Sequence, residues 1–352
     1  MIVKNEAPVI LRCLGSIKHQ IDYWVIVDTG STDGTQRILR EFLQDIPGEL
    51  HERHWVDFSH NRNEALQLAK NKGDYLLFMD ADDQLEFSKD FSMPDLTKDY
   101  YLIVQEKNAL MSMTTQSIAL IDNRLDWTWI GAIHELIEPR EGRSWELLSG
   151  VRCLYHQDGS RSRDPEKFLK DAHLLEKELK KEPGNARFWL YLALSYEIAT
   201  QYELALKTYE QRAKMGGWEE EVFYSLFRIA HVQRRLGQNP DFFIEGYMKA
   251  YQFRPTRAEP LYWLADYYIA VENYVMGYVI SKLGASIPLP SKDLFYVERF
   301  VYEYGLLNQM ADCAYFLGKH QETRNTYKKI LAQKNLPAPT RSRIENNMQC
   351  LN

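Results

Sequence analysis

Cysteine is scarce in this sequence, and the few cysteines are scattered. The 352 residues include only Cys13, Cys153, Cys313 and Cys350, and no two of them form a C-x-x-C pair. This spacing predicts neither a zinc site nor a disulfide framework. We therefore expect reduced thiols in a cytoplasmic protein.

Long apolar runs and an excess of positive charge are also missing. No stretch of 18 consecutive apolar residues is present, so we expect no membrane-spanning helix. The formal net charge is −6, which argues against a surface that binds nucleic acid. Because apolar residues make up 45% of the chain and charged residues 26%, a globular protein is expected rather than a disordered one.

The N-terminus shows no secretory signal peptide, because residues 1–6 (MIVKNE) already read as the end of a strand. This start is abrupt, and either a clipped first strand or a start codon further upstream would account for it. The length of 352 residues suits two domains, each with its own core.

In the first half of the chain, short apolar runs alternate with segments of helical periodicity. Two runs read as buried strands, 23–27 (YWVIV) and 75–79 (YLLFM), and each is followed closely by an aspartate, Asp28 or Asp80. Further strands are expected at 51–55, 101–104 and 118–121, and helices at about 32–43 and 61–71. This alternation predicts an α/β domain with a mostly parallel sheet and helices on both faces. Since ligands bind beyond the carboxyl ends of such strands, the pattern singles out Asp28 and Asp80.

Past residue 160 the pattern becomes almost entirely helical. The segment 187–213 has the spacing of a tetratricopeptide repeat, carried by Trp189, Leu192, Ala193, Tyr196, Ala205 and Tyr209. Further copies begin near Phe223, Leu261 and Met310. Because one hairpin cannot bury its own apolar face, we expect an all-α, tetratricopeptide-like solenoid over residues 161–352, after an α/β domain over residues 1–160. A generic helical bundle is the alternative, since the spacing is irregular after the second copy.

An acidic cluster, residues 80–83 (DADD), follows the second buried strand. Two carboxylates two residues apart can bind different parts of one ligand. One can accept a hydrogen bond from a ribose hydroxyl, and the other can bind a hard divalent cation. A diphosphate leaving group needs such a cation, because negative charge grows on it as the sugar bond breaks. A solvated acidic turn is the competing interpretation, because D-x-D is common.

Residues 27–35 (VDTGSTDGT) lead from the first buried strand through a glycine turn into a helix. Ser31 or Thr32 can cap this helix, and Asp33 suits the dipole of its first turn. Capping does not explain Asp28, whose side chain we expect in the crevice, where it can accept a hydrogen bond from a base or a ribose.

Four blocks, MIVKNE, VDTGSTDGT, SHNRNEAL and DADD, occur in this order within residues 1–85. Together they resemble glycosyltransferase family 2, which has the GT-A fold, and the trailing repeats resemble a subset of that family fused to tetratricopeptide repeats. Bacterial members of this subset include peptide S-glycosyltransferases. The resemblance implies a metal-dependent, inverting, hexosyltransferase-type enzyme. Its donor would be a nucleotide-diphosphate sugar, with UDP-sugar favoured, and its acceptor a glycan, a lipid-linked sugar or a protein.

The resemblance also implies roles for individual residues. Asn5 and Glu6 would lie near the nucleoside, and Asp28 would contact the base. Asp80 would touch the ribose, and Asp82 would bind Mn²⁺ or Mg²⁺.

A further block implies two more contacts. Arg62 and Asn63 would lie near the sugar or the diphosphate. The family block usually reads A-R-N, whereas here Asn61 precedes Arg62. For Arg62, an ion pair on a helix surface is the alternative.

Residues 127–135 (WTWIGAIHE) resemble a W-x-G-x-x-H-E pattern of this family. Aromatic faces suit sugar rings, so Trp127 and Trp129 are candidate contacts to the sugar or the acceptor. Glu135 is the candidate general base toward an acceptor hydroxyl. A strand over 133–137 would point His134 and Glu135 to opposite faces. The alternative is a pair of core tryptophans beside an exposed edge-strand glutamate.

His156, just before the second domain, resembles the C-terminal metal-binding histidine of many GT-A enzymes and would complete the cation shell. A structural histidine is the alternative. The basic residues that follow, Arg161, Arg163 and Lys167, either approach the diphosphate or belong to a solvated linker.

Two rival classes of protein remain to be weighed. A nucleotidyltransferase usually carries a glycine-rich loop with Arg and Lys after its first strand, and residues 4–8 (KNEAP) contain no such loop. The second rival is a protein-binding adaptor with an inactive transferase domain. In either case the concave groove of stacked hairpins suits an extended peptide or a second subunit, and part of an acceptor site could come from the repeats.

Overall fold

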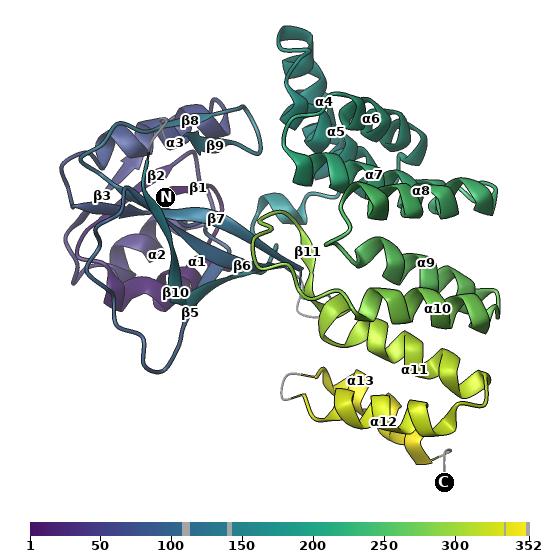
Figure 1. Cartoon of the computed structure of the whole chain (residues 1–352). Coiled ribbons are helices and arrows are strands. Elements are labelled where there is room, and N and C mark those ends of the chain that lie inside the picture. The colour runs from purple at the N-terminus through teal and green to yellow at the C-terminus, as the bar shows by residue number, and fades with distance from the viewer. Residues whose placement is uncertain (108–112, 139–142, 334–335, 350–352) are drawn as a thin grey trace. The chain divides into compact units, whose positions relative to one another are not determined.

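The computed structural model of the chain describes residues 1–107, 113–138, 143–333 and 336–349 (Figure 1). The chain divides into two compact units. The first comprises residues 1–108 and 115–199, and the second comprises residues 109–114 and 200–352. Within the described ranges, no helix is long and apolar enough to cross a membrane.

The first sheet of the first unit is entirely parallel and has the order β1-β2-β3. Its strands are β1 (Ile2–Val3), β2 (Trp24–Asp28) and β3 (Gly48–Glu52). The helices between and after them are α1 (Ile10–Ile17), with a 3₁₀ turn at Lys18–Gln20, α2 (Thr35–Phe42) and α3 (Phe58–Leu68). The core of this layer includes Ile10, Leu14, Ile26, Leu39 and Leu43. The strand and helix alternation expected from the sequence is therefore confirmed here.

The second sheet of this unit is mixed. Its strands are β4 (Tyr75–Leu77), β5 (Asp83–Phe87), β6 (Tyr100–Lys107), β7 (Met113–Asp122) and β10 (Trp145–Tyr155). β10 runs parallel to β6 and antiparallel to β5, and β4 pairs antiparallel with β7. A separate antiparallel ribbon joins β8 (Thr128–Ile130) to β9 (Leu136–Glu138). The all-parallel arrangement is thus limited to β1–β3.

Helix α2 begins three residues later than the sequence suggests. Gly34 has φ +91° at the N-cap, and the Asp33 carboxylate accepts the Thr35 N–H at 3.0 Å. A left-handed residue cannot continue an α-helix, and glycine adopts this conformation at little cost. Residues 29–34 therefore form a turn, which shapes the carboxyl end of β2.

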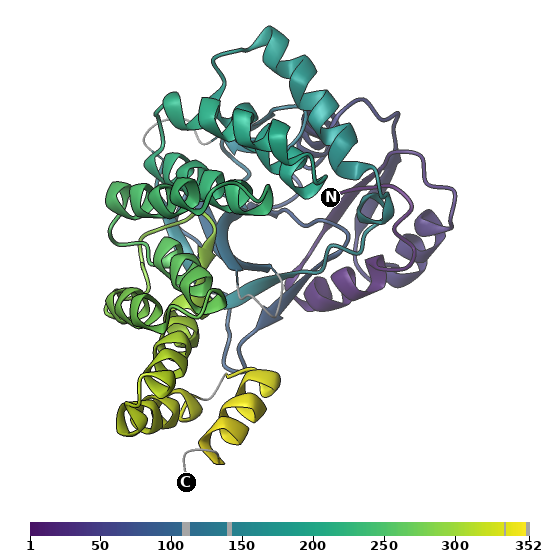
Figure 2. The same cartoon turned by 90° about the vertical axis from the view of Figure 1, so that its right-hand side faces the viewer.

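The described residues after β10 are mostly helical (Figures 1 and 2). A 3₁₀ turn at Arg161–Arg163, α4 (Lys167–Lys181) and α5 (Ala186–Ile198) belong to the first unit. The second unit contains α6 (Tyr202–Lys214), α7 (Glu219–Arg235), α8 (Pro240–Phe253), α9 (Glu259–Ala270), α10 (Tyr274–Ala285), α11 (Leu306–Phe316), α12 (His320–Leu331) and α13 (Ala338–Gln349). Successive helices pack on each other, and the repeat positions Phe223, Ala230, Leu261, Leu264 and Ala265 share one buried cluster. The predicted solenoid of helical hairpins is confirmed.

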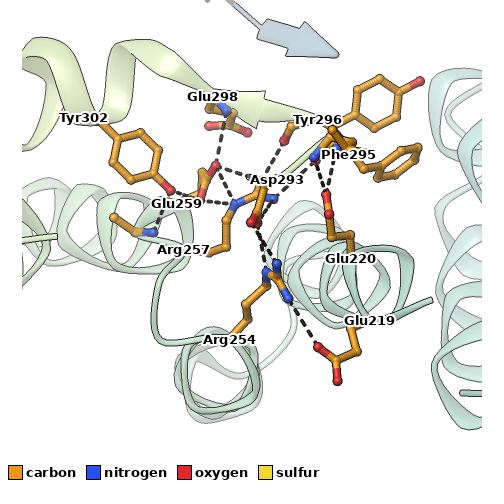
Figure 3. Close-up of polar contacts among 12 residues, drawn as sticks. Glu219, Glu220, Arg254, Arg257, Glu259, Asp293, Phe295, Tyr296, Glu298 and Tyr302 are labelled. Atoms are coloured by element: carbon orange, nitrogen blue, oxygen red, sulfur yellow. Dashed lines mark hydrogen bonds and ion pairs between the residues drawn. The ribbon is translucent and has the colours of Figure 1, made fainter. Parts of the chain in front are cut away.

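An insertion between α10 and α11 interrupts the repeats. It carries β11 (Val297–Glu298) and a π-turn at Val301–Gly305. Its residues 293–298 run across α7 and α9, where Glu220 accepts the N–H groups of Leu294 and Phe295 at 2.8 Å (Figure 3). Arg257, only 1% exposed, donates to Glu259, to Asp293 and to two carbonyls of the same segment. A buried cation therefore holds the insertion on the helices.

The cysteines show no disulfide among the described residues. Cys13, Cys153 and Cys313 are free and buried. Cys350 lies outside the described residues.

Candidate active site

The end of β1 is fastened to the turn that follows β2. Asn5 has φ +56°, a left-handed conformation that asparagine tolerates better than most residues. Its N–H donates to Ser31 Oγ at 2.8 Å, and its Oδ1 accepts the Thr32 N–H at 2.7 Å. The Glu6 N–H donates to Thr35 Oγ1 at 2.9 Å. The polar side chains of the VDTGSTDGT block thus position the first turn of the chain.

Asp28 is buried, with 1% of its surface exposed. Its carboxylate accepts the N–H groups of Gly30 and Ser31 at 3.3 and 3.0 Å and the amide of Gln36 at 2.8 Å. An aspartate that bonds to the backbone two or three residues on stabilises a tight turn. The structure therefore gives Asp28 a role in shaping this turn, and its contact with a base stays a prediction.

Arg62, on α3, joins two carboxylates from separate parts of the unit. Its Nη2 donates to Asp80 Oδ1 at 2.6 Å, and its Nε donates to Glu135 Oε1 at 2.5 Å. Burial opposes the charge of this side chain, but the two carboxylates raise its pKa above the ordinary value for arginine. The Arg62 side chain is 13% exposed and that of Asp80 is 46% exposed. Arg62 is therefore not a helix-surface ion pair, and Asp80 keeps an open side.

Asn63 and the two tryptophans are engaged in packing. Asn63 exchanges two 2.8 Å hydrogen bonds with the backbone of Trp129. Trp127 is 6% exposed, and its indole N–H donates to the Asp122 carbonyl at 2.8 Å. The Trp127 ring therefore packs in the core, and its contact with a sugar or acceptor stays a prediction.

Trp129 is also largely buried, at 9% exposure. The guanidinium carbon of Arg62 lies 4.9 Å from its ring centroid, and the Phe78 ring packs edge-on at 5.0 Å. A cation over an indole face is a favourable arrangement. Trp129 therefore supports Arg62, and its contact with a sugar stays a prediction.

The strand predicted over 133–137 is wrong, because β9 begins only at Leu136. Gly131 and His134 have φ values of +94° and +51°, so the chain turns sharply before β9. The His134 ring stacks on Tyr191 of α5 with centroids 4.0 Å apart, whereas Glu135 turns to Arg62. The two side chains do take different directions, as expected, but a turn causes this. Glu135 is not an exposed edge residue, since its side chain is 9% exposed.

Asp82 and Glu6 meet at the backbone of residues 159 and 160. Asp82 Oδ2 accepts the Gly159 N–H at 3.0 Å, and the Glu6 carboxylate accepts the Ser160 N–H at 3.0 and 3.2 Å. A Cβ added at Gly159 would lie 2.9 Å from Asp82 Oδ2 and 3.3 Å from Glu6 Oε2. A larger residue at position 159 would therefore have to displace the Asp82 carboxylate, and the two acids lie beside the same short stretch of backbone.

Arg12, Gly159 and Ser160 were missed by the sequence reasoning. Arg12 forms a two-pronged ion pair with Asp158 at 2.6 and 2.7 Å and also donates to the Asp82 carbonyl at 3.0 Å. Arg12 is 70 positions from Asp82 and 146 positions from Asp158 along the chain. No local spacing could have indicated these contacts, since Arg12 and Asp158 lie outside the four motif blocks.

Burial, with a smaller contribution from neighbouring carboxyl groups, raises the pKa of two acids in this region. Burial raises the pKa of Glu6 to about 7, and nearby Asp82 adds to this, while the Ser160 N–H opposes it. Burial also raises the pKa of Asp83 to about 8, with Asp80 and Asp82 adding to the effect. Crowded carboxyl groups favour a bound cation or a proton.

The donor set suits a hard divalent cation. Asp82, Asp80 and Glu6 all offer carboxylate oxygens, and Mg²⁺ is usually held by one or two carboxylates together with substrate phosphates. Among the residues that the structure describes, no group of three or more His, Cys, Asp and Glu side chains forms a ready metal cluster. His156 Nε2 lies 3.0 Å from Gln84 Oε1 and is exposed, so its metal role stays a prediction.

The basic residues after His156 have separate partners. Arg163 donates to the Asn5 carbonyl at 3.3 Å, which places it beside the β1 turn. Arg161 pairs with Asp171 and lies over the Phe58 ring at 4.8 Å. Lys167 donates to Ser162 Oγ at 3.3 Å. Of the three, Arg163 is the one that this structure places next to a predicted nucleoside contact.

Acidic side chains gather beyond the strand ends of the α/β unit, and helical repeats follow this unit in the chain. Such an arrangement is typical of a ligand-binding domain fused to a repeat region. Residues 1–93 match the sequence model of the family described as Glycosyl transferase family 2. The family match therefore covers the first 93 residues of the first unit.

Curated relatives match a larger part of the chain. A TPR repeat-containing protein of Synechococcus elongatus is 27% identical over 270 residues, which cover 72% of this chain and 65% of the relative. The SPbeta prophage-derived glycosyltransferase SunS of Bacillus subtilis is 25% identical over 212 residues, which cover 54% of this chain and 46% of SunS. The chain thus spans less than two thirds of either relative.

Solved structures resemble the chain only distantly. The crystal structure of MamA is 15% identical, with a TM-score of 0.38, over 56% of this chain and 99% of MamA. The C-terminal part of a TPR repeat-containing protein from Cytophaga hutchinsonii is 14% identical, with a TM-score of 0.40, over 53% of this chain and 68% of that one.

Proposed function

We propose that this chain is a hexosyltransferase-type glycosyltransferase. It moves a sugar from a nucleotide-diphosphate sugar, with UDP-sugar favoured, to a glycan, a lipid-linked sugar or a protein. The family match over residues 1–93 supports the reaction class. The structural observation that carries the proposal is the convergence of Asp82 and Glu6 on the backbone of Gly159 and Ser160.

The nucleotide occupies the carboxyl ends of β1, β2 and β4 in this proposal. Asn5, Glu6 and Asp28 form the nucleoside side, and Asp80 accepts a ribose hydroxyl with its open face. Arg62 and Arg163 supply positive charge toward the diphosphate. The exposure of Asp80 and the proximity of Arg163 to the Asn5 carbonyl support this arrangement.

Asp82 holds Mn²⁺ or Mg²⁺ in this proposal, with His156 as a further ligand. When bound there, the cation offsets the negative charge that develops on the leaving diphosphate. The Gly159 N–H bonds only Oδ2 of Asp82. Asp82 can therefore keep this bond and still present its other oxygen.

Glu135 receives the proton of the acceptor hydroxyl. Arg62 pairs with both Glu135 and Asp80. The proposed base is therefore held in a fixed position relative to the proposed ribose contact. Positioning of this kind accounts for a large part of enzymatic rate enhancement. A single displacement by the acceptor inverts the anomeric carbon.

The helical repeats dock the acceptor, a partner peptide or a second copy of the chain. The parts of α7 and α9 that hold residues 293–298 are already covered by the chain itself (Figure 3). Docking must therefore use other surfaces of the repeats. Cross-linking of the full chain to its acceptor would locate them, and cross-links confined to residues 1–160 would contradict a docking role.

Hydrolysis of the donor tests the proposed activity. The full chain is incubated with a panel of nucleotide sugars, with and without Mn²⁺ or Mg²⁺, and the released nucleotide is measured. Asp82→Asn should lower metal-dependent release by roughly 100-fold or more. Asp126→Asn, at a side chain that is 75% exposed, should leave it unchanged.

Two outcomes would overturn parts of the proposal. Wild-type turnover in Asp82→Asn would refute the metal role of Asp82. No release from the wild-type chain with any donor and metal would favour the adaptor alternative.

A further inference from the structure

An exposed tryptophan, Trp55, follows the carboxyl edge of the parallel sheet. β2 and β3 run parallel, and their last residues, Asp28 and Glu52, are registered with each other. The Arg53 N–H then donates to the Asp28 carbonyl at 2.9 Å. Trp55 comes two residues later, and 42% of its surface is exposed. Since ligands bind beyond the carboxyl ends of such strands, Trp55 lies at the edge where the nucleotide is proposed to bind.

The buried amide of Asn61 fixes the backbone on both sides of Trp55. Asn61 lies on α3 and is fully buried. Its Oδ1 accepts the Val56 N–H at 3.0 Å, and its Nδ2 donates to the His54 carbonyl at 3.0 Å and to Glu64 Oε2 at 2.8 Å. An alanine at this position could form none of these bonds. The residue that departs from the A-R-N block is therefore the one that holds residues 54–56.

An aromatic neighbour supports the indole of Trp55. The centroid of the Phe58 ring lies 4.7 Å from that of Trp55, with the two planes 80° apart. The guanidinium carbon of Arg161 lies 4.8 Å from the centroid of the Phe58 ring. Asp57 caps α3 by accepting the His60 N–H at 2.8 Å, which fixes Phe58 as the first residue of the helix. The indole is thus packed against a fixed side chain, while part of its surface stays open.

An exposed indole on a fixed backbone suits a flat ligand. Every nucleobase has a π-face, so stacking on an aromatic ring binds bases whatever their hydrogen-bonding groups. Holding the ring in place before binding lowers the entropy that binding must cost. The carboxylate of Asp28 already accepts three donors of its own turn and of α2. A stacked indole therefore adds an affinity for the base that hydrogen bonds to Asp28 supply only in part.

We infer that the base of the donor nucleotide stacks on the indole of Trp55, and that Asn61 is the positioning residue that holds this indole in place. The inference rests on the proposed function, because it assigns one part of the donor to one side chain. The ligand class is a nucleoside diphosphate. Its base lies against residues 54–56, and its ribose lies toward Asp80.

Binding of a nucleotide to the full chain tests the stack. UDP, GDP and dTDP are titrated into the wild type with Mn²⁺ by calorimetry, and the tightest of them is used for the variants. Trp55→Ala should weaken its binding by roughly 10-fold or more, whereas Trp55→Phe keeps a stacking face and should lose less than about threefold. Trp145→Ala is the matched control, at a side chain of similar exposure at the start of β10, and it should leave binding unchanged.

A ligand without the base separates stacking from a change in the shape of the site. Ribose 5-diphosphate carries the same ribose and diphosphate groups as a nucleoside diphosphate. Its affinity should be equal for the wild type and for Trp55→Ala, because the contact that is lost goes to the base. A loss as large as that seen with the nucleotide would overturn the inference.

A double variant tests the role of Asn61. Asn61→Ala releases the backbone beside Trp55 and should weaken nucleotide binding several-fold. In the Trp55→Ala background the same change should add little, because the indole that it positions is already absent. Fully additive losses would contradict a positioning role for Asn61. Circular dichroism of each variant shows that the chain is folded.

Two results distinguish this inference from the proposed function. Nucleotide binding by the wild type, with the same affinity in Trp55→Ala, would overturn the stack and leave the proposed function standing. A wild-type chain that binds none of the nucleoside diphosphates, with Mn²⁺ or Mg²⁺, would overturn both.

Discussion

The Nε atom of Arg62 lies 2.5 Å from Oε1 of Glu135, while Nη2 of the same side chain lies 2.6 Å from Oδ1 of Asp80. One buried cation thus fixes two carboxylates that come from the end of β4 and from the turn before β9. Their relative position is set by side-chain bonds as well as by the backbone. Changes at either carboxylate should therefore be felt at the other.

Replacement of Glu135 tests its role as the base. Glu135→Gln keeps the shape of the side chain but cannot accept a proton, so turnover should fall by roughly 100-fold or more, with little change in the KM for the donor. Glu138→Gln, at an exposed position two residues past the start of β9, is the matched control. Steady-state kinetics with an acceptor decide the matter, and a loss below about threefold would exclude Glu135 as the base.

Loss of Arg62 should destabilise the first unit. Arg62→Met leaves Glu135 buried without its partner, which should cost about 3 kcal/mol of unfolding free energy. Arg152→Met removes an exposed ion pair with Glu86 and Glu106 and should cost less than about 1 kcal/mol. Urea unfolding gives both values.

A double variant completes this test. Adding Glu135→Gln to Arg62→Met removes the unpaired charge, so part of the lost stability should return. Strictly additive losses would show that the ion pair is not what holds this region together.

Glu6 should make stability depend on pH. The folded protein holds this carboxyl at a pKa of about 7, raised from 4.5. Between these values the folded chain binds a proton that the unfolded chain has released, so the contribution of Glu6 is complete below pH 4.5 and is lost as pH rises through 7. The wild type should therefore lose stability relative to Glu6→Gln over this window. Urea unfolding at a series of pH values measures this, and parallel curves would contradict the shifted pKa.

The insertion between α10 and α11 should depend on Arg257. Arg257→Met leaves the fully buried Glu259 without its cation, whereas Asp293 keeps its ion pair with Arg254. Breaking a buried ion pair from one side costs about 3–5 kcal/mol. Circular dichroism during urea unfolding would record this loss. Arg234→Met, at a partly exposed pair with Asp266, serves as the control and should lose less than about 1 kcal/mol.

The sequence could predict the elements whose pattern is local. β2 ends at Asp28 as the apolar run 23–27 indicates, and the repeat positions Tyr209 and Leu261 are fully buried. The start of α2 and the absence of a strand at Ile133 could not be predicted in the same way, because both depend on backbone conformations with positive φ, at Gly34 and His134.

The arrangement of the candidate site depends on contacts between distant parts of the sequence more than the helices and strands do. Motif blocks pointed to Arg62, Asp80 and Glu135 separately, but no spacing indicated that one guanidinium would join them. Arg12 and Gly159 gave no signal at all, since their importance arises only where residues far apart in the chain meet Asp82. The burial of Trp127 could not be predicted, because an aromatic residue in a motif looks the same whether it faces a ligand or the core.

Binding of a nucleotide sugar is the most direct test of the central claim. Thermal shift of the full chain is recorded across a panel of nucleotide-diphosphate sugars, with and without Mn²⁺, since a ligand that binds the folded state stabilises it by mass action. We predict that at least one donor, a UDP-sugar in the first place, raises the melting temperature only when Mn²⁺ is present, and that Asp82→Asn abolishes the shift. No shift with any donor, or the same shift in Asp82→Asn, would contradict the account.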